Sequence, residues 1–355
     1  MRKFYHLRVA AKRNETRDSV RLALDVPKEL REFFAFQPGQ HLPLRATVDG
    51  KLVRRTYSIC SAQHAWPLEI GVRVQPGGAF SGYVANELQP GDELEVMPPF
   101  GQFHKGSNGR GAKAYVAFAA GSGITPILSI VASILAEEAD SEVCLFYGNR
   151  RLATTMFIDD LYALKNRYPS RLQLHFVFSQ EEQEFPIAAG RLDADKVRDL
   201  WARFLHGMEP DEAFICGPDT MIDTVRETLA ELGMSAASVH AEHFGAPKKV
   251  QRQMPAVSAG KGSTEVTVVM DGHRTSFEML ESDSNIVDAA AAHGIDLPYS
   301  CKGGVCATCR CHLREGEVVM AVNHGLELWE LEKGYILACQ STPVTPTLTL
   351  DYDLA

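Results

Sequence analysis

The residues best suited to chemistry in this chain are four cysteines near its C-terminal end. Cys301, Cys306 and Cys309 follow one another in C-x4-C-x2-C spacing, and Cys339 comes after 29 intervening residues. One close trio and one distant thiol are typical of a [2Fe–2S] cluster, because a single loop can wrap the cluster and the fourth ligand then closes the site. The spacing therefore predicts a carrier of single electrons.

Two other uses of these cysteines compete with a cluster. A structural zinc site more often has two short C-x2-C pairs, whereas this sequence has one. A disulfide would need an oxidising compartment, of which there is no other sign. Gly303 and Gly304 suit a tight loop that turns its N–H groups toward sulfur. Cys311 falls outside the ligand spacing, and Cys60 and Cys144 are expected to be core thiols.

Length and composition limit the class of protein. The chain has 355 residues, of which 45% are hydrophobic and 23% charged, as in globular proteins of two or three domains. The sequence has neither an apolar run long enough for a membrane span nor an N-terminal signal region, so we expect a cytoplasmic protein with reduced cysteines. There is no basic patch with interleaved aromatic residues, and we expect no nucleic-acid partner.

The negative charge is concentrated in the part that carries the cysteines. From Ser263 to the end there are 14 acidic and 5 basic residues, and this excess equals the net charge of −9 of the whole chain. It predicts either a well-solvated surface or an acidic docking face that steers a basic partner surface toward the protein.

Residues 1–105 are expected to form an antiparallel β-barrel, since short alternating runs are separated by turn signals such as Gln37-Pro38-Gly39. The expected strands are 4–10, 20–26, 40–47, 53–59, 69–74 and 93–97, with a short helix at 80–88. In Arg55-Thr56-Tyr57-Ser58, the arginine and the tyrosine project to one face, so a guanidinium could pair with a phosphate while the ring stacks on a flat cofactor. Gly77-Gly78-Ala79-Phe80-Ser81 opens the helix and could receive a phosphate. Alone, these stretches also read as an exposed strand and an ordinary helix-entry turn.

Residues 106–245 are expected to form a parallel α/β sheet, with a boundary at Gly106–Gly111. The expected strands are 114–120, 142–148, 172–179 and 212–216, and the expected helices are 124–137, 157–167, 193–204 and 219–231. Gly121-Ser122-Gly123-Ile124-Thr125-Pro126 follows the first strand and opens a helix, which suits a pyrophosphate, although Pro126 replaces the third glycine of the dinucleotide fingerprint.

The ends of the later strands carry further candidates. Asn149 and Arg150 end the second strand, where a guanidinium could pair with a 2′-phosphate and favour NADPH over NADH. Ser179 and Arg191 could add to that pocket, while Arg150 could also be a plain surface charge. Cys216 ends the fourth strand and reads from sequence alone as a small buried residue or a site thiol.

The last part of the chain reads as a tether followed by a third domain. Residues 246–262 contain Pro, Gly, Ser and four basic residues, and they are expected to form a linker that keeps residues 263–355 at high local concentration. In 263–355 we expect strands at 265–270 and 273–278 around an Asp271-Gly272 hairpin turn, then a helix at 285–293.

The order of these motifs resembles the ferredoxin–NADP reductase family with a C-terminal plant-type ferredoxin. The resemblance is carried by Arg55–Ser58, Gly71–Val74, Gly77–Ser81, Pro98–Gly101 and the cysteine loop. It implies a multidomain fold: an antiparallel β-barrel flavin domain, an α/β parallel-sheet nucleotide domain and an α+β β-grasp ferredoxin domain. It also implies FAD, although a few relatives hold FMN, together with a [2Fe–2S] cluster and NADPH.

The resemblance also implies roles for individual residues. Arg55 and Ser81 bind flavin phosphates, Tyr57 stacks on the isoalloxazine, and Ser58 lies near its reactive nitrogen. Ser58, Cys216 and Glu242 are the residues implied at the reacting rings, where Cys216 helps to align the nicotinamide. The implied flavin contacts are Arg55, Thr56, Tyr57, Ser58, Val72, Arg73, Val74, Gly77, Gly78, Phe80, Ser81 and Phe244. The implied NADP contacts are Gly121, Ser122, Gly123, Thr125, Pro126, Asn149, Arg150, Ser179, Cys216, Gly217 and Pro218. The cluster ligands are Cys301, Cys306, Cys309 and Cys339, and His243 is expected at the surface.

Three modules in series imply a route for electrons. NADPH gives up two electrons together, a [2Fe–2S] cluster takes one, and a flavin can connect the two. The module order resembles reductases that serve di-iron oxygenases, those of the phenylacetyl-CoA epoxidases among them. The chain has no Glu-x-x-His pairs of a di-iron bundle, so the oxygenase would be a separate chain. A reductase for another oxygenase or hydroxylase remains an alternative, as does an iron–sulfur redox sensor, although no DNA-binding segment is evident.

Overall fold

The computed structural model describes residues 3–104, 112–244, 263–326 and 328–354. The chain forms two compact units, one built largely from residues up to Phe244 and the other from Gly245–Ala355. The boundary expected at Gly106–Gly111 and the linker expected at 246–262 lie outside the described residues. Within the described ranges, no helix has the length and apolar character needed to cross a membrane.

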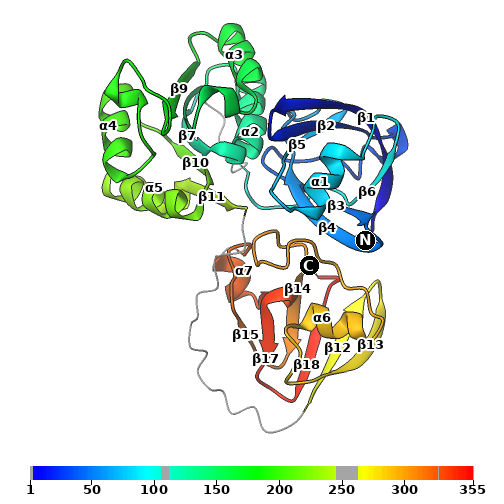
Figure 1. The fold of residues 1–355 in the computed structure, drawn as a ribbon. Coiled ribbons are helices and arrows are strands. Elements are labelled where there is room, and N and C mark those ends of the chain that lie inside the picture. Colours follow the sequence, from blue (N-terminus) through cyan, green and yellow to red (C-terminus); the bar gives the residue numbers. More distant parts are fainter. Residues whose placement is uncertain (1–2, 105–111, 245–262, 327, 355) are drawn as a thin grey trace. The chain divides into compact units, whose positions relative to one another are not determined.

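The N-terminal part of the larger unit is an antiparallel barrel (Figure 1), as expected. Its sheet order is β4-β3-β6-β1-β2-β5, and a bridge between Ile59 and Ile70 joins the two edge strands. The elements are β1 (Tyr5–Thr16), β2 (Ser19–Asp25), β3 (His41–Val48), β4 (Lys51–Ser58), β5 (Leu68–Arg73), β6 (Glu93–Val96) and α1 (Ala79–Asn86).

The core of the barrel is built from alternate residues of β1 and from β2, which is buried along nearly its whole length. Leu7 and Val9 of β1 are fully buried, as are Leu22 and Leu24 of β2, while their neighbours along β1 are exposed. Each such side chain contributes about 1.5–3 kcal/mol when it is buried. Phe80 of α1 is also buried, so this helix packs against the barrel core.

The second part of the larger unit is the expected parallel sheet with helices on both faces. The strand order is β11-β10-β7-β8-β9. The strands are β7 (Ala114–Ala120), β8 (Glu142–Asn149), β9 (Leu172–Phe178), β10 (Glu212–Gly217) and β11 (Val239–His243). Helices α2 (Ile124–Glu137) and α3 (Ile158–Arg167) pack into one core, and α4 (Ala194–Phe204) and α5 (Asp219–Glu231) pack into the other. Strand order reverses between β7 and β10, and such switch points are where sheets of this kind bind ligands.

Strand β11 is an element that the sequence pattern did not indicate. Its sequence, Val-His-Ala-Glu-His, has no apolar alternation, and all five residues are only half-buried. It pairs with β10 in parallel and forms one edge of the sheet, where one side of the strand has no neighbour to bury it. An edge strand of this kind carries little hydrophobic signal.

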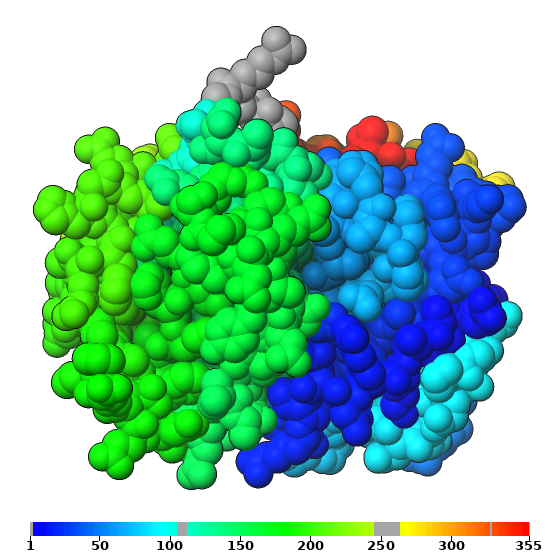
Figure 2. Space-filling model, turned by 90° about the horizontal axis from the view of Figure 1, so that it is seen from above, coloured from blue at the N-terminus to red at the C-terminus, as the bar shows by residue number. Residues whose placement is uncertain are grey.

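A buried arginine and the carboxylates around it connect the barrel to the α/β domain. Arg21 of β2 donates to Glu15 at 2.9 Å, to Asp160 of α3 at 2.9 Å and to Glu69 at 3.4 Å. Glu15 also accepts a hydrogen bond from the backbone N–H of Phe157 at 2.8 Å, and the Phe157 ring lies under the guanidinium. We call Arg21, Glu15, Glu69 and Asp160 the Arg21 cluster. The surfaces of the two domains adjoin in Figure 2, where the barrel is blue and the α/β domain green.

A half-buried histidine in the α/β domain leads us to expect that stability depends on pH. His175 of β9 stacks between Phe146 and Phe204, and burial, helped by the charge of Lys165, lowers its pKa to about 4. The unfolded chain therefore binds this proton more readily, so stability should fall as the pH drops from about 6.5 toward 4. The contribution of His175 to the free energy of unfolding is at most about 3 kcal/mol, and solvent screening of the partly exposed ring makes it smaller.

Replacing His175 by phenylalanine should remove this loss of stability at low pH. We expect the free energy of unfolding of the variant, measured with urea at several pH values, to change less between pH 7 and pH 5 than that of the wild type. The surface variant His206→Phe is the control. Equal pH slopes in all three proteins would contradict the assignment.

The smaller unit has the expected β-grasp arrangement. Its mixed sheet has the order β13-β12-β18-β14-β16, with β12 and β18 parallel. The strands are β12 (Thr264–Met270), β13 (His273–Met279), β14 (Arg310–Glu315), β16 (Tyr335–Leu337) and β18 (Thr347–Asp351), with β15 (Val318–Met320) paired to β17 (Ser341–Pro343). Helix α6 (Ile286–Ala292) buries Ile286 and Val287, and α7 (Leu328–Glu332) precedes β16.

Candidate functional site

The barrel places the expected flavin residues on β4 and at the start of α1. Arg55 is exposed, and its guanidinium donates to the carbonyl oxygen of Arg54 at 2.7 Å. Tyr57 is half-buried with its ring 5.8 Å from that of Phe80, and Ser58 is buried at the end of the strand. An exposed guanidinium next to a supported aromatic ring has the chemistry to hold a phosphate and a flat ring.

The turn before α1 is shaped by its glycines and by Ser81. Gly77 has a φ of +71°, and the Ser81 hydroxyl accepts from the backbone N–H of Gln75 at 3.1 Å while it donates to the carbonyl oxygen of Gly78 at 3.3 Å. The backbone N–H groups at this helix start can receive an anion. The Phe80 side chain lies in the barrel core, so a flavin contact from this residue would have to come from its backbone.

The loop between β7 and α2 forms the second phosphate-binding candidate. Gly121–Gly123 is a tight helical turn in which Gly121 has a φ of +55°, and Tyr147 donates to its carbonyl oxygen at 2.9 Å. Thr125 closes the turn by donating to the carbonyl oxygen of Ser122 at 3.0 Å. The guanidinium of Arg73, implied by the resemblance to contact flavin, lies 3.5 Å from where a Cβ at Gly121 would stand. Its position also suits a nucleotide phosphate.

A substitution at Gly123 tests whether this loop binds the nucleotide. A Cβ at Gly123 would stand 2.1 Å from the carbonyl oxygen of Cys216, so α2 and β10 approach too closely for any side chain. Gly123→Ala should therefore separate them, lower the unfolding temperature by several degrees and weaken nucleotide binding at least about tenfold. Gly82→Ala on α1, which has nothing within 4 Å, is the control and should be neutral. Unchanged nucleotide affinity in Gly123→Ala, measured by calorimetry, would argue against this loop as the binding site.

The residues expected to bind a 2′-phosphate come together at the ends of β8 and β9. The backbone N–H of Ser179 donates to the carbonyl oxygen of Asn149 at 2.9 Å, and the backbone N–H of Gln180 donates to the carbonyl oxygen of Arg150 at 2.9 Å. Arg191 follows Gly190, whose N–H donates to Phe178 at 2.9 Å. Arg150 and Arg191 are both exposed. This edge can therefore present two cations and a hydroxyl to an anion.

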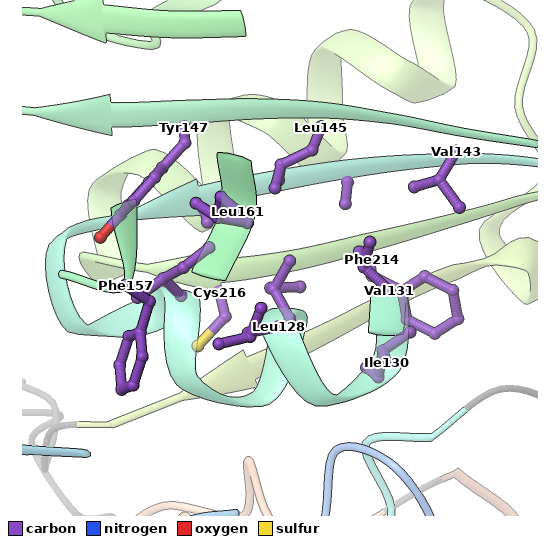
Figure 3. Close-up of a cluster of buried hydrophobic side chains, with 14 of the residues drawn as sticks. Leu128, Ile130, Val131, Val143, Leu145, Tyr147, Phe157, Leu161, Phe214 and Cys216 are labelled. Carbon is purple, nitrogen blue, oxygen red and sulfur yellow. The ribbon is translucent and has the colours of Figure 1, made fainter. Parts of the chain in front are cut away.

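Cys216 lies in the apolar core beneath α2. Its side chain is fully buried, and Figure 3 shows its sulfur near Leu128 in the cluster that lines this face of the sheet. Burial raises the pKa of the thiol well above its usual value, so the group is neutral at physiological pH. The structure gives Cys216 the environment of a packing residue, and its role beside the nicotinamide stays a prediction.

Glu242 stands beside Cys216 at the end of β11. The two residues are partners in the parallel register of β10 and β11. Glu242 meets His41 of β3, with Nδ1 of the histidine 3.2 Å from Oε1 of the carboxylate. Phe244 has a 42% exposed ring next to this edge. Sequence reasoning missed His41, because no local pattern links it to a residue two hundred positions away.

The expectation that His243 lies at the surface was wrong. Its side chain is 9% exposed, and its Nδ1 lies 2.8 Å from Oδ1 of Asp219. Asp219 begins α5, and the turn that follows β10 brings its carboxylate to the neighbouring strand.

In the smaller unit, the four expected cluster ligands form two adjacent pairs of thiols. Cys301 hydrogen-bonds Cys306, and Cys309 hydrogen-bonds Cys339. Cys306 and Cys309 also interact electrostatically, so the pairs are neighbours. Two thiols for each of two irons is the arrangement that a [2Fe–2S] cluster requires.

Within each pair of thiols, the hydrogen bond between the two sulfurs lowers the pKa of one thiol (Cys301, Cys339) and, together with burial, raises the pKa of the other (Cys306, Cys309). The N–H of Gly303 donates to Cys301 at 3.3 Å, and the Thr308 hydroxyl donates to Cys306 at 3.2 Å. The hydrogen bond from Cys306, with backbone donors, lowers the pKa of Cys301 to about 5. Gly304 has a φ of +76°, and a Cβ there would stand 2.8 Å from Val322, so the loop needs a glycine. Donors of this kind suit the sulfurs of an iron–sulfur site.

Three family models match the chain in sequence. They are an oxidoreductase FAD-binding domain over residues 6–105, an oxidoreductase NAD-binding domain over residues 118–227 and a 2Fe-2S iron-sulfur cluster binding domain over residues 268–344. The chain therefore carries binding domains for FAD, for NAD(P) and for a [2Fe–2S] cluster.

Two curated relatives match nearly the whole length of the chain. One, from Escherichia coli (strain K12), is a component of 1,2-phenylacetyl-CoA epoxidase and is 42% identical over 99% of both chains. The other, from Rhodococcus rhodochrous, is the ferredoxin reductase component of 3-ketosteroid-9-alpha-monooxygenase. It is 36% identical over 98% of this chain and 96% of its own.

A solved structure has the same modular build. Phthalate dioxygenase reductase, described as a modular structure for electron transfer from pyridine nucleotides to [2Fe-2S], is 27% identical, with a TM-score of 0.59 over 98% of each chain. The expected fold class, an antiparallel flavin barrel with a parallel nucleotide sheet and a ferredoxin module, is thereby confirmed.

Proposed function

Since this chain belongs to the family of ferredoxin reductases that join FAD, NAD(P) and [2Fe–2S] domains, we propose that it passes electrons from NADPH to a separate di-iron oxygenase. The proposed partner is phenylacetyl-CoA epoxidase. The observation that carries this choice is the 42% identity over 99% of both chains with the component of the Escherichia coli epoxidase.

The residues of the larger unit bind and orient the two-electron donor. The Gly121–Gly123 turn and the start of α2 hold the pyrophosphate, and Arg150 with Ser179 holds the 2′-phosphate, which favours NADPH over NADH. Tyr57 and Ser58 orient the flavin, while Cys216 and Glu242 border the nicotinamide. Bound FAD supplies the ability to take two electrons together and release them singly.

The residues of the smaller unit hold the one-electron carrier. The paired thiols Cys301/Cys306 and Cys309/Cys339 bind the irons, and the N–H and hydroxyl donors around the sulfurs stabilise their charge. The acidic excess from Ser263 onward supports docking to a basic partner surface. None of the eight cysteines forms a disulfide, which supports a cytoplasmic location.

A second candidate is a reductase for another oxygenase. The 36% identical relative serves a 3-ketosteroid monooxygenase, so reductases similar to this chain over nearly its whole length occur with more than one kind of oxygenase. The redox-sensor alternative has no observation in its favour.

The test is reconstitution with a defined acceptor. Purified protein should show overlapping flavin and [2Fe–2S] absorbance that NADPH bleaches. Added to purified oxygenase subunits of phenylacetyl-CoA epoxidase, it should support NADPH oxidation that depends on phenylacetyl-CoA. Activity with oxygenase subunits of a 3-ketosteroid monooxygenase instead would favour the second candidate, and a colourless or zinc-containing protein would contradict both.

A further inference from the structure

A histidine from the barrel and a glutamate from the α/β domain meet inside the larger unit. The side chains of His41 and Glu242 are 4% and 11% exposed, and their Nδ1 and Oε1 atoms are 3.2 Å apart. The second carboxylate oxygen, Oε2, is buried and has no hydrogen-bond partner within the described residues. A buried carboxylate oxygen without a donor is unfavourable, so this atom is a candidate acceptor for a ligand.

The pair lies where the two expected ring-binding sites converge. Glu242 is the register partner of Cys216 at the carboxyl ends of β10 and β11, the edge that also carries Gly123. His41 opens β3, and the N–H of Ile59 donates to the residue before it, Gln40, at 2.9 Å. The strand end that carries Ser58 is therefore next to His41, and the pair connects the flavin side to the nicotinamide side.

The backbone around His41 fixes its ring. His41 and Phe100 exchange two backbone hydrogen bonds, each of 2.9 Å. Gly101 has a φ of +126°, and a Cβ there would lie 2.9 Å from Cε1 and 3.0 Å from Nδ1 of the imidazole. The absence of a side chain at Gly101 therefore leaves room for the His41 ring in the position where it contacts Glu242.

We propose that His41 is a positioning residue for hydride transfer from the nucleotide to the flavin. It holds Glu242 through Oε1 and so keeps Oε2 oriented for a hydrogen-bond donor of the bound cofactors. In that step the nicotinamide is oxidised and the flavin is reduced, with two electrons and one proton passing together as hydride. The inference rests on the proposed function and concerns only the alignment of the two rings. Nucleotide affinity comes mainly from phosphate contacts farther away, so His41 should affect the rate of transfer rather than binding.

The test is anaerobic stopped-flow reduction of the FAD-loaded protein by NADPH. His41→Leu should slow the limiting rate of flavin reduction at least about tenfold, because small misplacements of reacting atoms are costly, while the dissociation constant for NADPH stays within about twofold. The long-wavelength charge-transfer absorbance of the nucleotide–flavin complex should weaken. His41→Gln, which keeps a donor, should recover most of the rate. In the double variant, Glu242→Gln should slow flavin reduction little beyond the effect of His41→Leu alone.

A matched control exists in the same domain. His240 of β11 pairs with Glu212 of β10, with Nε2 and Oε2 3.2 Å apart, at the opposite ends of the same strands. His240→Leu should leave the rate of flavin reduction unchanged. FAD content and unfolding temperature of each variant show whether it is folded, and His41→Gln supplies a folded comparison if His41→Leu is not.

Three outcomes would overturn the inference: a wild-type rate in His41→Leu, a glutamine variant as slow as the leucine variant, or an equal loss in His240→Leu. Failure of the proposed donor looks different, since in that case NADPH would not reduce the flavin of the wild-type protein at all. Failure of the proposed acceptor would appear only in the reconstitution with oxygenase subunits and would leave flavin reduction unchanged.

Discussion

Replacing Cys339 by serine is expected to remove the [2Fe–2S] cluster and leave the flavin reaction intact. Cys339 supplies one of the two thiols of the Cys309 pair, and the iron on that side would keep only one protein ligand. The absorbance of the cluster should disappear, and electron delivery to cytochrome c should fall on the order of a hundredfold or more. NADPH should still bleach the flavin at the wild-type rate in stopped-flow measurements.

Cys311→Ser is the matched control for this experiment. Cys311 is equally buried but lies on β14, where it pairs with Ile336, outside the two thiol pairs. The variant should retain iron, acid-labile sulfide and electron delivery. Full cluster content in Cys339→Ser, or its loss in Cys311→Ser, would reassign the fourth ligand.

Replacing Arg150 by alanine should weaken NADPH binding far more than NADH binding. The exposed guanidinium stands at the end of β8 beside Ser179, and a charge-assisted hydrogen bond to a phosphate is worth about 1.5–3 kcal/mol. The dissociation constant for NADPH should therefore rise about ten- to hundredfold, whereas that for NADH should change by less than about twofold. Titration of the flavin protein with NADP⁺ and NAD⁺, which differ by the same 2′-phosphate and leave the flavin oxidised, measures the corresponding change in affinity for each nucleotide.

Arg226→Ala provides the control for lost positive charge. Arg226 is an exposed arginine on α5 of the same domain, so its removal changes the net charge equally. It should leave both affinities unchanged. If Arg150→Ala weakened NADPH and NADH by the same factor, the 2′-phosphate assignment would be wrong.

Helices and strands could be predicted from the sequence where the hydrophobic pattern lies within the element itself. Alternation indicated the six barrel strands, and apolar runs such as Ala114–Ala120 indicated parallel strands buried on both faces. Strand β11 was missed because an edge strand need not carry apolar residues. The three-residue strands β15, β16 and β17 were missed because they are too short to show a period.

The same distinction applies to the site. The ligand cysteines were predictable because three of them share one loop and spacing alone indicates a cluster. The partnership of His41 with Glu242 spans 201 positions, and that of Arg21 with Asp160 spans 139. No pattern within a single element contains such pairs, since they exist only after two domains have packed together. His243 was misjudged for a related reason within one domain, because its burial depends on Asp219, which lies 24 positions away at the start of α5.

The Arg21 cluster limits how this protein can be recombined with its relatives. A chimera that took only the α/β domain from another reductase could lose Asp160 from beside Arg21, whose side chain is 4% exposed. Loss of one partner from a fully buried ion pair costs up to about 3–5 kcal/mol. The cost here is smaller, because the Asp160 side chain is 36% exposed and the carboxylates of Glu15 and Glu69 remain beside Arg21. The barrel and the α/β domain are therefore best exchanged together as a single cassette. Designs that cut between them would have to keep an aspartate at position 160 of the incoming domain.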